Sequence, residues 1–274
     1  MGEGMRRGFI FSLIAIAISG VLLGYSLFLF NSNEEYKNLN LDFLELKKVD
    51  FVSGNISSNI SNFFDINTVL KNKTVEFEIN LNGDKNFFAL SSFETFYNNV
   101  FENLAGGDLN VNADGLTDGK AEIFFDNHTF EFDYNNKIIK VIPISDLNYI
   151  LNISVNNYYT SRTVWTYSIS GVYVTLNYSD LNGTYSNSGY INGSALCSTN
   201  SFTVNYGFDK LKINVCKDNL INGVLVIDGD FSSTYTADVN LDATSNSEIK
   251  SAYYNADLNY ILNDSKYIGK VHAR

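Results

Sequence analysis

One stretch of the chain places oxygen-bearing side chains at alternate positions, a spacing that suits calcium binding. Counting from Asn110, the order is Asn, any residue, Asn, any residue, Asp, Gly, and then Asp at the ninth position. Ca²⁺ takes roughly six to eight oxygen ligands from carboxylates, amides and backbone carbonyls, and the glycine permits a sharp turn. Calcium is therefore the candidate cofactor, with the ligands Asn110, Asn112, Asp114 and Asp118.

This stretch resembles EF-hand-like and thrombospondin-type calcium loops. It departs from them because its first position is Asn110 rather than Asp, and because Glu122 lies one residue beyond the place of the bidentate Glu. A solvated loop between a helix and a strand is the alternative. A similar alternation of Asp238, Asn240 and Asp242 is interpreted as an edge strand.

Nine Asn-x-Ser/Thr sequences are acceptors for N-glycosylation if they lie outside the cytoplasm. Composition alone predicts roughly six such sequences. Their number is therefore weak evidence for glycosylation, and the expected location outside the cytoplasm is the stronger argument. The acceptor residues are Asn55, Asn59, Asn72, Asn127, Asn152, Asn177, Asn182, Asn192 and Asn263.

The two cysteines, Cys197 and Cys216, cannot close a zinc site alone, and their spacing is not that of a metal-binding motif. Outside the cytoplasm they predict a disulfide, which in the chain-entropy model would stabilise the fold by about 3 kcal/mol. Two reduced, buried cysteines are the alternative.

The sequence carries no catalytic motif that we can identify. His128 and His272 form no ligand pair, and there is no nucleophile elbow or phosphate-binding loop. Carboxylates are too frequent to select one catalytic pair. The formal net charge of −11 argues against nucleic acid and against anionic headgroups, which attract clustered Lys and Arg. We therefore expect neither an enzyme nor a nucleic-acid partner.

The elements that position these groups begin with an apolar run from Phe9 to Phe30, which contains no charged residue. As a helix it would measure roughly 33 Å, enough to cross a hydrocarbon core of about 30 Å. Arg6 and Arg7 precede this run and acidic residues follow it. The positive-inside rule therefore predicts a single-pass protein of the cell membrane with a cytoplasmic N-terminus and an extracellular bulk. A cleaved secretory signal is disfavoured, because large apolar residues end the run.

The residues Arg6, Arg7, Gly8 and Phe9 resemble the prepilin-type, or class III, signal of archaeal and bacterial type IV pilin-like proteins. The resemblance implies cleavage between Gly8 and Phe9, with the apolar helix retained as membrane anchor and filament core. Leu13 stands where many pilins carry a Glu linked to subunit packing. The resemblance therefore supports cleavage after Gly8 more strongly than assembly into a filament. The absence of Gln and the frequent Asn are typical of an AT-rich genome and favour an archaeal member.

Residues 1–30 therefore form the anchor, and residues 31–70 are expected to form an amphipathic helix followed by a linker. Apolar side chains at positions 36, 39, 43 and 46 recur at helical spacing, and this helix would extend the anchor as a stalk. Small polar residues from Ser53 to Ser61 predict the linker.

Residues 71–274 predict an antiparallel β-sandwich, in one unit or in two of about 71–157 and 158–274, with one short helix at 92–104. The heptapeptide from Asp146 to Asn152 recurs from Asp257 to Asn263, either through duplication of a β unit or through biased composition. Strands are expected at 75–81, 86–90, 120–126, 129–134, 137–143, 147–156, 163–169, 171–178, 202–208, 211–217, 223–228, 233–241, 249–261 and 266–272.

Together these features predict a mainly β, membrane-anchored structural or adhesive protein of the cell surface. Its partners would be the membrane, through residues 9–30, and either further copies of itself or other envelope proteins. One alternative is an anchored module that binds carbohydrate or another ligand, with exposed aromatic side chains along a groove. Another is an anchored hydrolase, with paired acids of perturbed pKa in a pocket.

Overall fold

The structure is a computed structural model that describes residues 47–82, 92, 95–101, 108–116, 119–192, 201–218, 221–231, 235–262 and 265–273. The chain divides into a unit of residues Met1–Asp50 and a unit of residues Phe51–Arg274. Within the described ranges, no helix has both the length and the apolar character needed to cross a bilayer. The expected anchor, residues 9–30, lies outside those ranges.

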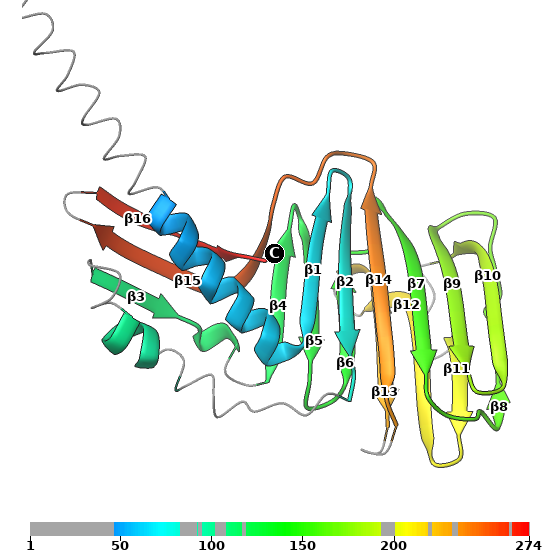
Figure 1. The fold of residues 1–274 in the computed structure, drawn as a ribbon. Coiled ribbons are helices and arrows are strands. Elements are labelled where there is room, and N and C mark those ends of the chain that lie inside the picture. Colours follow the sequence, from blue (N-terminus) through cyan, green and yellow to red (C-terminus); the bar gives the residue numbers. More distant parts are fainter. Residues whose placement is uncertain are drawn as a thin grey trace, which may run out of the picture. The chain divides into compact units, whose positions relative to one another are not determined.

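The larger unit contains two β-sheets (Figure 1). The first has six strands, in the order β1 (Ile66–Lys71), β2 (Thr74–Asn80), β14 (Ala237–Ser245), β7 (Leu147–Val155), β9 (Val172–Asp180) and β10 (Gly183–Ile191). The second has ten, in the order β16 (Ser265–His272), β15 (Ala252–Leu262), β4 (Lys120–Phe125), β5 (His128–Asp133), β6 (Ile138–Ile142), β13 (Ile221–Asp230), β12 (Asp209–Asp218), β11 (Ser201–Tyr206) and β8 (Ser161–Arg162), with β3 (Asp108–Asn112) paired to β15.

Alternating side chains give the strands one apolar face and one polar face, and the apolar faces of the two sheets form the core. In β7, Leu147, Tyr149, Leu151 and Ile153 are buried. Phe77 of β2 stacks on a ring of the other sheet, that of Phe130 in β5, with centroids 4.0 Å apart. Burial of these apolar faces provides the main driving force for the sandwich. The predicted β-sandwich is thus confirmed for the described part of the chain.

The strands pair antiparallel with one exception, since β7 and β9 run parallel. A parallel pair requires a crossover connection. Here residues 156–171 leave the first sheet, contribute β8 to the edge of the second sheet, and return. At the return, Gly171 has φ of 130°, and a Cβ atom there would lie 2.2 Å from the carbonyl oxygen of Ile191, so only glycine fits.

The expected strand at 163–169 is wrong, because only Ser168 forms a β-bridge there, to Tyr190. The aromatic residues that suggested a strand serve as packing groups, since the buried Trp165 lies against Phe202. Conversely β10, rich in Gly, Ser and Asn, was not expected. It forms a nine-residue ladder with β9 despite its low strand propensity. The strand expected at 86–90 lies outside the described residues.

The linker expected from Ser53 to Ser61 is wrong, because residues 47–64 are helical. Val52, Ile56, Ile60 and Phe64 recur every four residues and are all buried, so one helix face packs on the core. This burial outweighs the modest helix propensity of the intervening Ser and Asn residues. The helix and linker were expected to extend to residue 70, but strand β1 begins at Ile66. The part of this helix that lies in the larger unit is called helix 51–64 below.

The short helix expected at 92–104 is helical at residues 92 and 95–101, with the π-helix η1 at Tyr97–Phe101. Tyr97 is buried, whereas Phe96 is exposed. Residues 147–152 of the first copy of the repeated heptapeptide lie in β7 of one sheet, and residues 257–262 of the second copy lie in β15 of the other. Tyr149 and Tyr260, its central residues, are both buried. Strands from both sides of residue 157 occur in each sheet, so the β region does not divide there.

Candidate functional site

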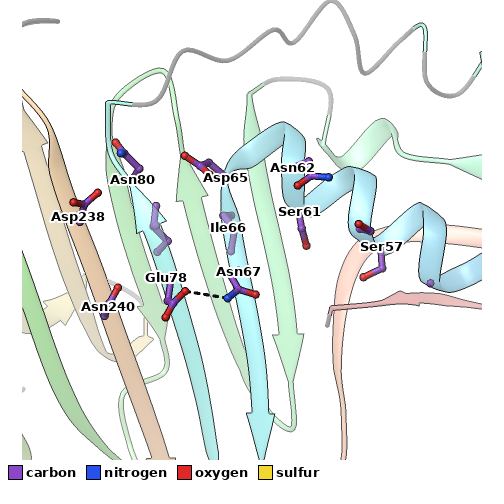
Figure 2. Close-up of a pocket in the computed structure, with 13 residues that line it drawn as sticks. Ser57, Ser61, Asn62, Asp65, Ile66, Asn67, Glu78, Asn80, Asp238 and Asn240 are labelled. Atoms are coloured by element: carbon purple, nitrogen blue, oxygen red, sulfur yellow. Dashed lines mark hydrogen bonds between the residues drawn. The ribbon is translucent and has the colours of Figure 1, made fainter.

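A groove lies between helix 51–64 and the first three strands of the six-stranded sheet (Figure 2). Asp65, with φ of 52°, makes the sharp turn from the helix into β1. The hollow measures about 680 Å³. The helix contributes Gly54, Ser57, Ser58, Ser61 and Asn62, and the strands contribute Ile66, Asn67, Glu78, Ile79, Asn80, Asp238 and Asn240.

The groove is polar because neighbouring strands present their outward side chains to it in register. Asn67 lies opposite Glu78, which lies opposite Asn240. The amide of Asn67 donates a hydrogen bond of 2.9 Å to Oε2 of Glu78, drawn in Figure 2. Asp238 pairs in the ladder with Asn80, whose side-chain oxygen accepts the backbone N–H of Asn82 at 2.9 Å. The groove lining therefore offers carboxylate, amide and hydroxyl groups.

Ser57 is the one groove residue whose side-chain hydroxyl is buried without a hydrogen-bond partner in the described part of the chain. Its residue exposure is 1%. A buried hydroxyl that lacks a partner is costly, because its hydrogen bonds to water are lost. The helix face that lines the groove carries Gly, Ser and Asn residues, and the Ser57 hydroxyl itself has almost no solvent-accessible surface.

The groove opens onto the outer face of the six-stranded sheet, where one polar row crosses all six strands. After Asn240 the row continues through Asn152, Asn177 and Ser186. The amide of Asn177 donates to Oδ1 of Asn152 at 2.8 Å, and the hydroxyl of Ser186 donates to Oδ1 of Asn177 at 2.7 Å. These bonds fix the side chains against the sheet and make the face an ordered polar surface.

Acidic side chains dominate the end of this face that adjoins the groove. Glu76 lies directly opposite Asp242, and Lys71 pairs with Glu76 at 2.6 Å. Burial, followed by the negative charge of Glu76, raises the pKa of Asp242 above its ordinary value, although Lys71 opposes this. The hydrogen bond to Glu76 raises the pKa of Lys71. The local potential is therefore negative.

At the far end of the face, two tyrosines lie side by side. Tyr173 of β9 and Tyr190 of β10 form an edge-to-face pair with centroids 5.1 Å apart, and both are exposed. Neither lines the groove. The exposed aromatic side chains expected along a binding groove therefore lie on the same face of the sheet but not in the groove.

The described calcium candidates lie on a strand and at the start of a short helix. Asn110 and Asn112 lie on the exposed face of β3, and Asp114 begins the 3₁₀ helix η2 (Asp114–Leu116). Oδ1 of Asn112 accepts the backbone N–H of Asp114 at 2.9 Å. Asp118 lies outside the described residues. Among the described residues no three His, Cys, Asp or Glu side chains form a metal cluster, and the calcium site stays a prediction.

The glycosylation candidates fall into distinct environments. Asn72, Asn127 and Asn182 lie exposed in hairpin turns, and Asn192 is exposed after β10. Asn152 and Asn177 are bonded to each other on the sheet. The remaining described acceptors, Asn55 and Asn59, are on helix 51–64. The amide of Asn59 donates a hydrogen bond to Tyr97 Oη at 2.9 Å, and the amide of Asn55 donates one to the carbonyl of Phe51 at 3.0 Å. Asn263 lies outside the described residues.

Cys216 is buried in β12 and is not a free thiol. Cys197 lies outside the described residues, so the pairing of these two cysteines stays a prediction.

His128 is buried, stacks on Phe125 and hydrogen-bonds through Nε2 to the carbonyl of Ser145 at 3.0 Å. His272 packs on Tyr253. Gly8 and Phe9, the expected processing site, lie outside the described residues.

The groove residues were not among the sequence candidates. Glu78 and Asn80 lie in the strand expected at 75–81, which contained no candidate site residue. Asp238 and Asn240 were assigned to an edge strand, which is wrong because β14 lies between β2 and β7. The alternation of polar and apolar residues in these strands indicates a solvated sheet face, but it does not show that helix 51–64 lies beside that face.

Comparison of the chain with protein-family models, with curated proteins and with solved structures finds no match. Its function is therefore inferred from its own residues and their geometry.

Proposed function

We propose that this protein is a membrane-anchored cell-surface protein with an adhesive role, and that it uses the outer face of the six-stranded sheet for recognition. The anchor is the apolar run 9–30, processed at Gly8 and Phe9 as in pilin-like proteins. The proposal rests chiefly on the polar row that crosses all six strands and ends in the groove. Such an ordered polar surface suits contacts with polar partners, because its hydrogen-bonding groups are already held in place.

The test compares cells that display the full chain with cells that display face variants. Asn148→Arg together with Ser188→Arg places two long cations on exposed positions of the outer face. We expect attachment of cells to surfaces and to one another to fall at least several-fold. The matched control is Asn246→Arg with Ser247→Arg, in the exposed loop after β14, which should leave attachment unchanged. Equal attachment by both double variants at equal display would contradict the proposal.

Carbohydrate binding is a second candidate, favoured by the exposed pair of Tyr173 and Tyr190. Hydroxyl and amide groups surround this pair, and the Tyr173 hydroxyl donates to Ser188 Oγ at 3.3 Å. Aromatic faces beside hydrogen-bonding groups suit the mixed polar and apolar surface of a sugar ring. Loss of glycan binding in Tyr173→Ala, with binding kept in Tyr158→Ala at an exposed loop, would support this candidate.

A further inference from the structure

The strand β10 forms one edge of the six-stranded sheet, and its outer side is open along most of its length (Figure 1). On its inner side β9 pairs with it over all nine residues. On its outer side the described residues provide one backbone hydrogen bond, from the N–H of Ser168 to the carbonyl of Tyr190 at 2.7 Å. An open edge presents unpaired N–H and C=O groups that can pair with another strand.

The open backbone groups of β10 belong to alternate residues. In an antiparallel strand both backbone groups of a residue point to the same side, and the side changes at each residue. Tyr190 points its groups away from β9, so Thr184, Ser186 and Ser188 do the same. The N–H of Ser188 is bonded to Oδ1 of Asn187 at 2.8 Å. Thr184 and Ser186 are left with both backbone groups directed outward and with no backbone partner among the described residues.

The other edges of the two sheets carry features that hinder such pairing. The edge strand β1 contains Lys71, and the edge strand β16 contains Lys266 and Lys270. The edge strand β8 has only two residues. The side chain of Asn98 covers β3, because it bonds both the N–H and the carbonyl of Val111. Edge lysines, short edge strands and covered edges are common protections against unwanted pairing, whereas β10 has nine residues and neither charge nor proline.

The segment that contains β10 is poor in charge and rich in exposed apolar side chains. Between residues 163 and 208 the only charged residue is Asp180. Its carboxylate accepts hydrogen bonds from the Tyr178 hydroxyl and from two backbone N–H groups of its own turn. Seven of the eleven large hydrophobic residues that are exposed in the described chain lie between 158 and 208. Depletion of charge together with exposed aromatic and aliphatic side chains is the composition of the core of a protein interface.

We propose that β10 is the interface of a homodimer, in which the β10 strands of two copies pair antiparallel about Ser186. The partner is a second copy because each copy has a formal net charge of −11, and two such chains repel each other least where neither carries charge. Ser186 is the middle of the open stretch 184–188, so a two-fold axis there uses the whole stretch and closes the assembly as a dimer. Ile169, which is 98% exposed, would then lie near Leu181 of the other copy.

This pairing joins two six-stranded sheets edge to edge and goes beyond the proposed function. Ser186 is the last residue of the polar row on the outer face, where its hydroxyl bonds to Asn177. The row of one copy would therefore continue into the row of the other. Pairing of purified chains requires neither attachment nor insertion in a membrane, so its test is independent of the adhesion test.

The test measures the oligomeric state of the full-length chain in detergent micelles by analytical ultracentrifugation. Ser186→Asp and Ser186→Lys each place two like charges across the axis and should weaken the dimer about tenfold. An equimolar mixture of the two variants places opposite charges across the axis and should restore the dimer. The matched controls, Ser247→Asp and Ser247→Lys in the exposed loop after β14, should dimerise as the unaltered chain does.

Ser186→Cys tests the register without adding charge. Residues directly opposite each other in an antiparallel pair have Cα atoms roughly 4.5–5.5 Å apart, which suits a disulfide. Mild oxidation should therefore link two copies of Ser186→Cys, whereas Ser247→Cys should stay unlinked.

A monomeric unaltered chain would overturn the proposal, and so would a dimer that both Ser186 charge variants leave intact. A mixture of the charge variants that stays monomeric would also overturn it, provided that each variant keeps the β-sheet circular dichroism of the unaltered chain. If the charge variants lose that signal, the Cys variant decides, because its failure to link would exclude pairing about Ser186.

Discussion

At the scale of single residues, the pKa values of two carboxyl groups are shifted in opposite directions by their surroundings. Asp242 lies across from Glu76, and burial followed by that neighbouring charge raises its pKa. Asp133 is also buried, which alone would raise its pKa. Hydrogen bonds from Asn136 and the charges of Lys120 and Lys140 outweigh that effect and lower it. Ionised Asp133 therefore stabilises the folded chain, whereas ionised Asp242 opposes folding.

Replacement of Asp133 by Asn tests this assignment. Its Oδ2 accepts the Asn136 amide at 2.8 Å, its Oδ1 accepts the Asn136 backbone N–H at 3.1 Å, and Lys120 Nζ lies 3.7 Å away. Loss of these charge-assisted bonds should lower the free energy of unfolding at pH 7 by roughly 1–3 kcal/mol. Unfolding in denaturant, followed by circular dichroism, measures the change.

The sign of the pH dependence follows from the lowered pKa of Asp133. The stabilisation is present above the ordinary carboxyl pKa of about 3.9 and is lost as the pH falls through the folded-state value. The difference between Asp133→Asn and the unaltered chain should therefore shrink below about pH 4. Exposed Glu248, changed to Gln, should show no such difference at either pH. A difference that stays constant down to pH 2 would rule the interpretation out.

At the scale of elements, the Asn-x-Ser/Thr glycosylation sequences lie in two settings, in hairpin turns and on the faces of strands. Asn72, Asn127 and Asn182 lie in exposed turns between paired strands. Asn152 and Asn177 face each other across β7 and β9 with their amides hydrogen-bonded. A glycan at Asn72 or Asn127 would disturb no ladder, whereas at Asn177 it would replace the amide hydrogen bond to Asn152. Asn182 is intermediate, because it lies in a turn but its amide donates to the carbonyl of Tyr159 at 2.9 Å.

We therefore expect glycan occupancy to be highest at Asn72 and Asn127, intermediate at Asn182, and lowest at Asn152 and Asn177. Glycopeptide mass spectrometry of the chain from its native cells measures the occupancy at each site. Thr184→Ala removes only the acceptor sequence of Asn182 and serves as the control for assignment. Glycans on the two sheet residues with bare turns would contradict the expectation, and nine bare sites would remove glycosylation altogether.

Elements were predictable from the sequence where local pattern and burial agree. The strands β4 to β7 follow the expected ranges closely, because apolar and polar residues alternate in them and one face is buried. Helix 51–64 and β10 were missed for the opposite reason. Their Ser, Asn and Gly residues favour turns locally, and only packing on the core or pairing with β9 gives them regular structure.

At the scale of the whole molecule, the proposed anchor at residues 9–30 would place the rest of the chain outside the cell. Intact-mass analysis of the chain from its native cells should give a mature N-terminus at Phe9, since Gly8 and Phe9 resemble a prepilin-type cleavage site. A Gly8→Leu variant should stay uncleaved and serves as the control. A chain beginning near Met1 or Met5 would leave a plain anchor, and a start beyond Phe30 would contradict the anchor itself.

The sequence by itself determined that most of the chain after residue 70 is β-structure, because the two-residue alternation is a local property of each strand. Only the tertiary structure decided where the polar faces meet. The groove joins helix 51–64 to β1, β2 and the distant β14, and the outer row depends on the register of six strands. Pairing partners and register arise from burial of the core as a whole, so Glu78 and Asp238 could not be brought together from their local sequences.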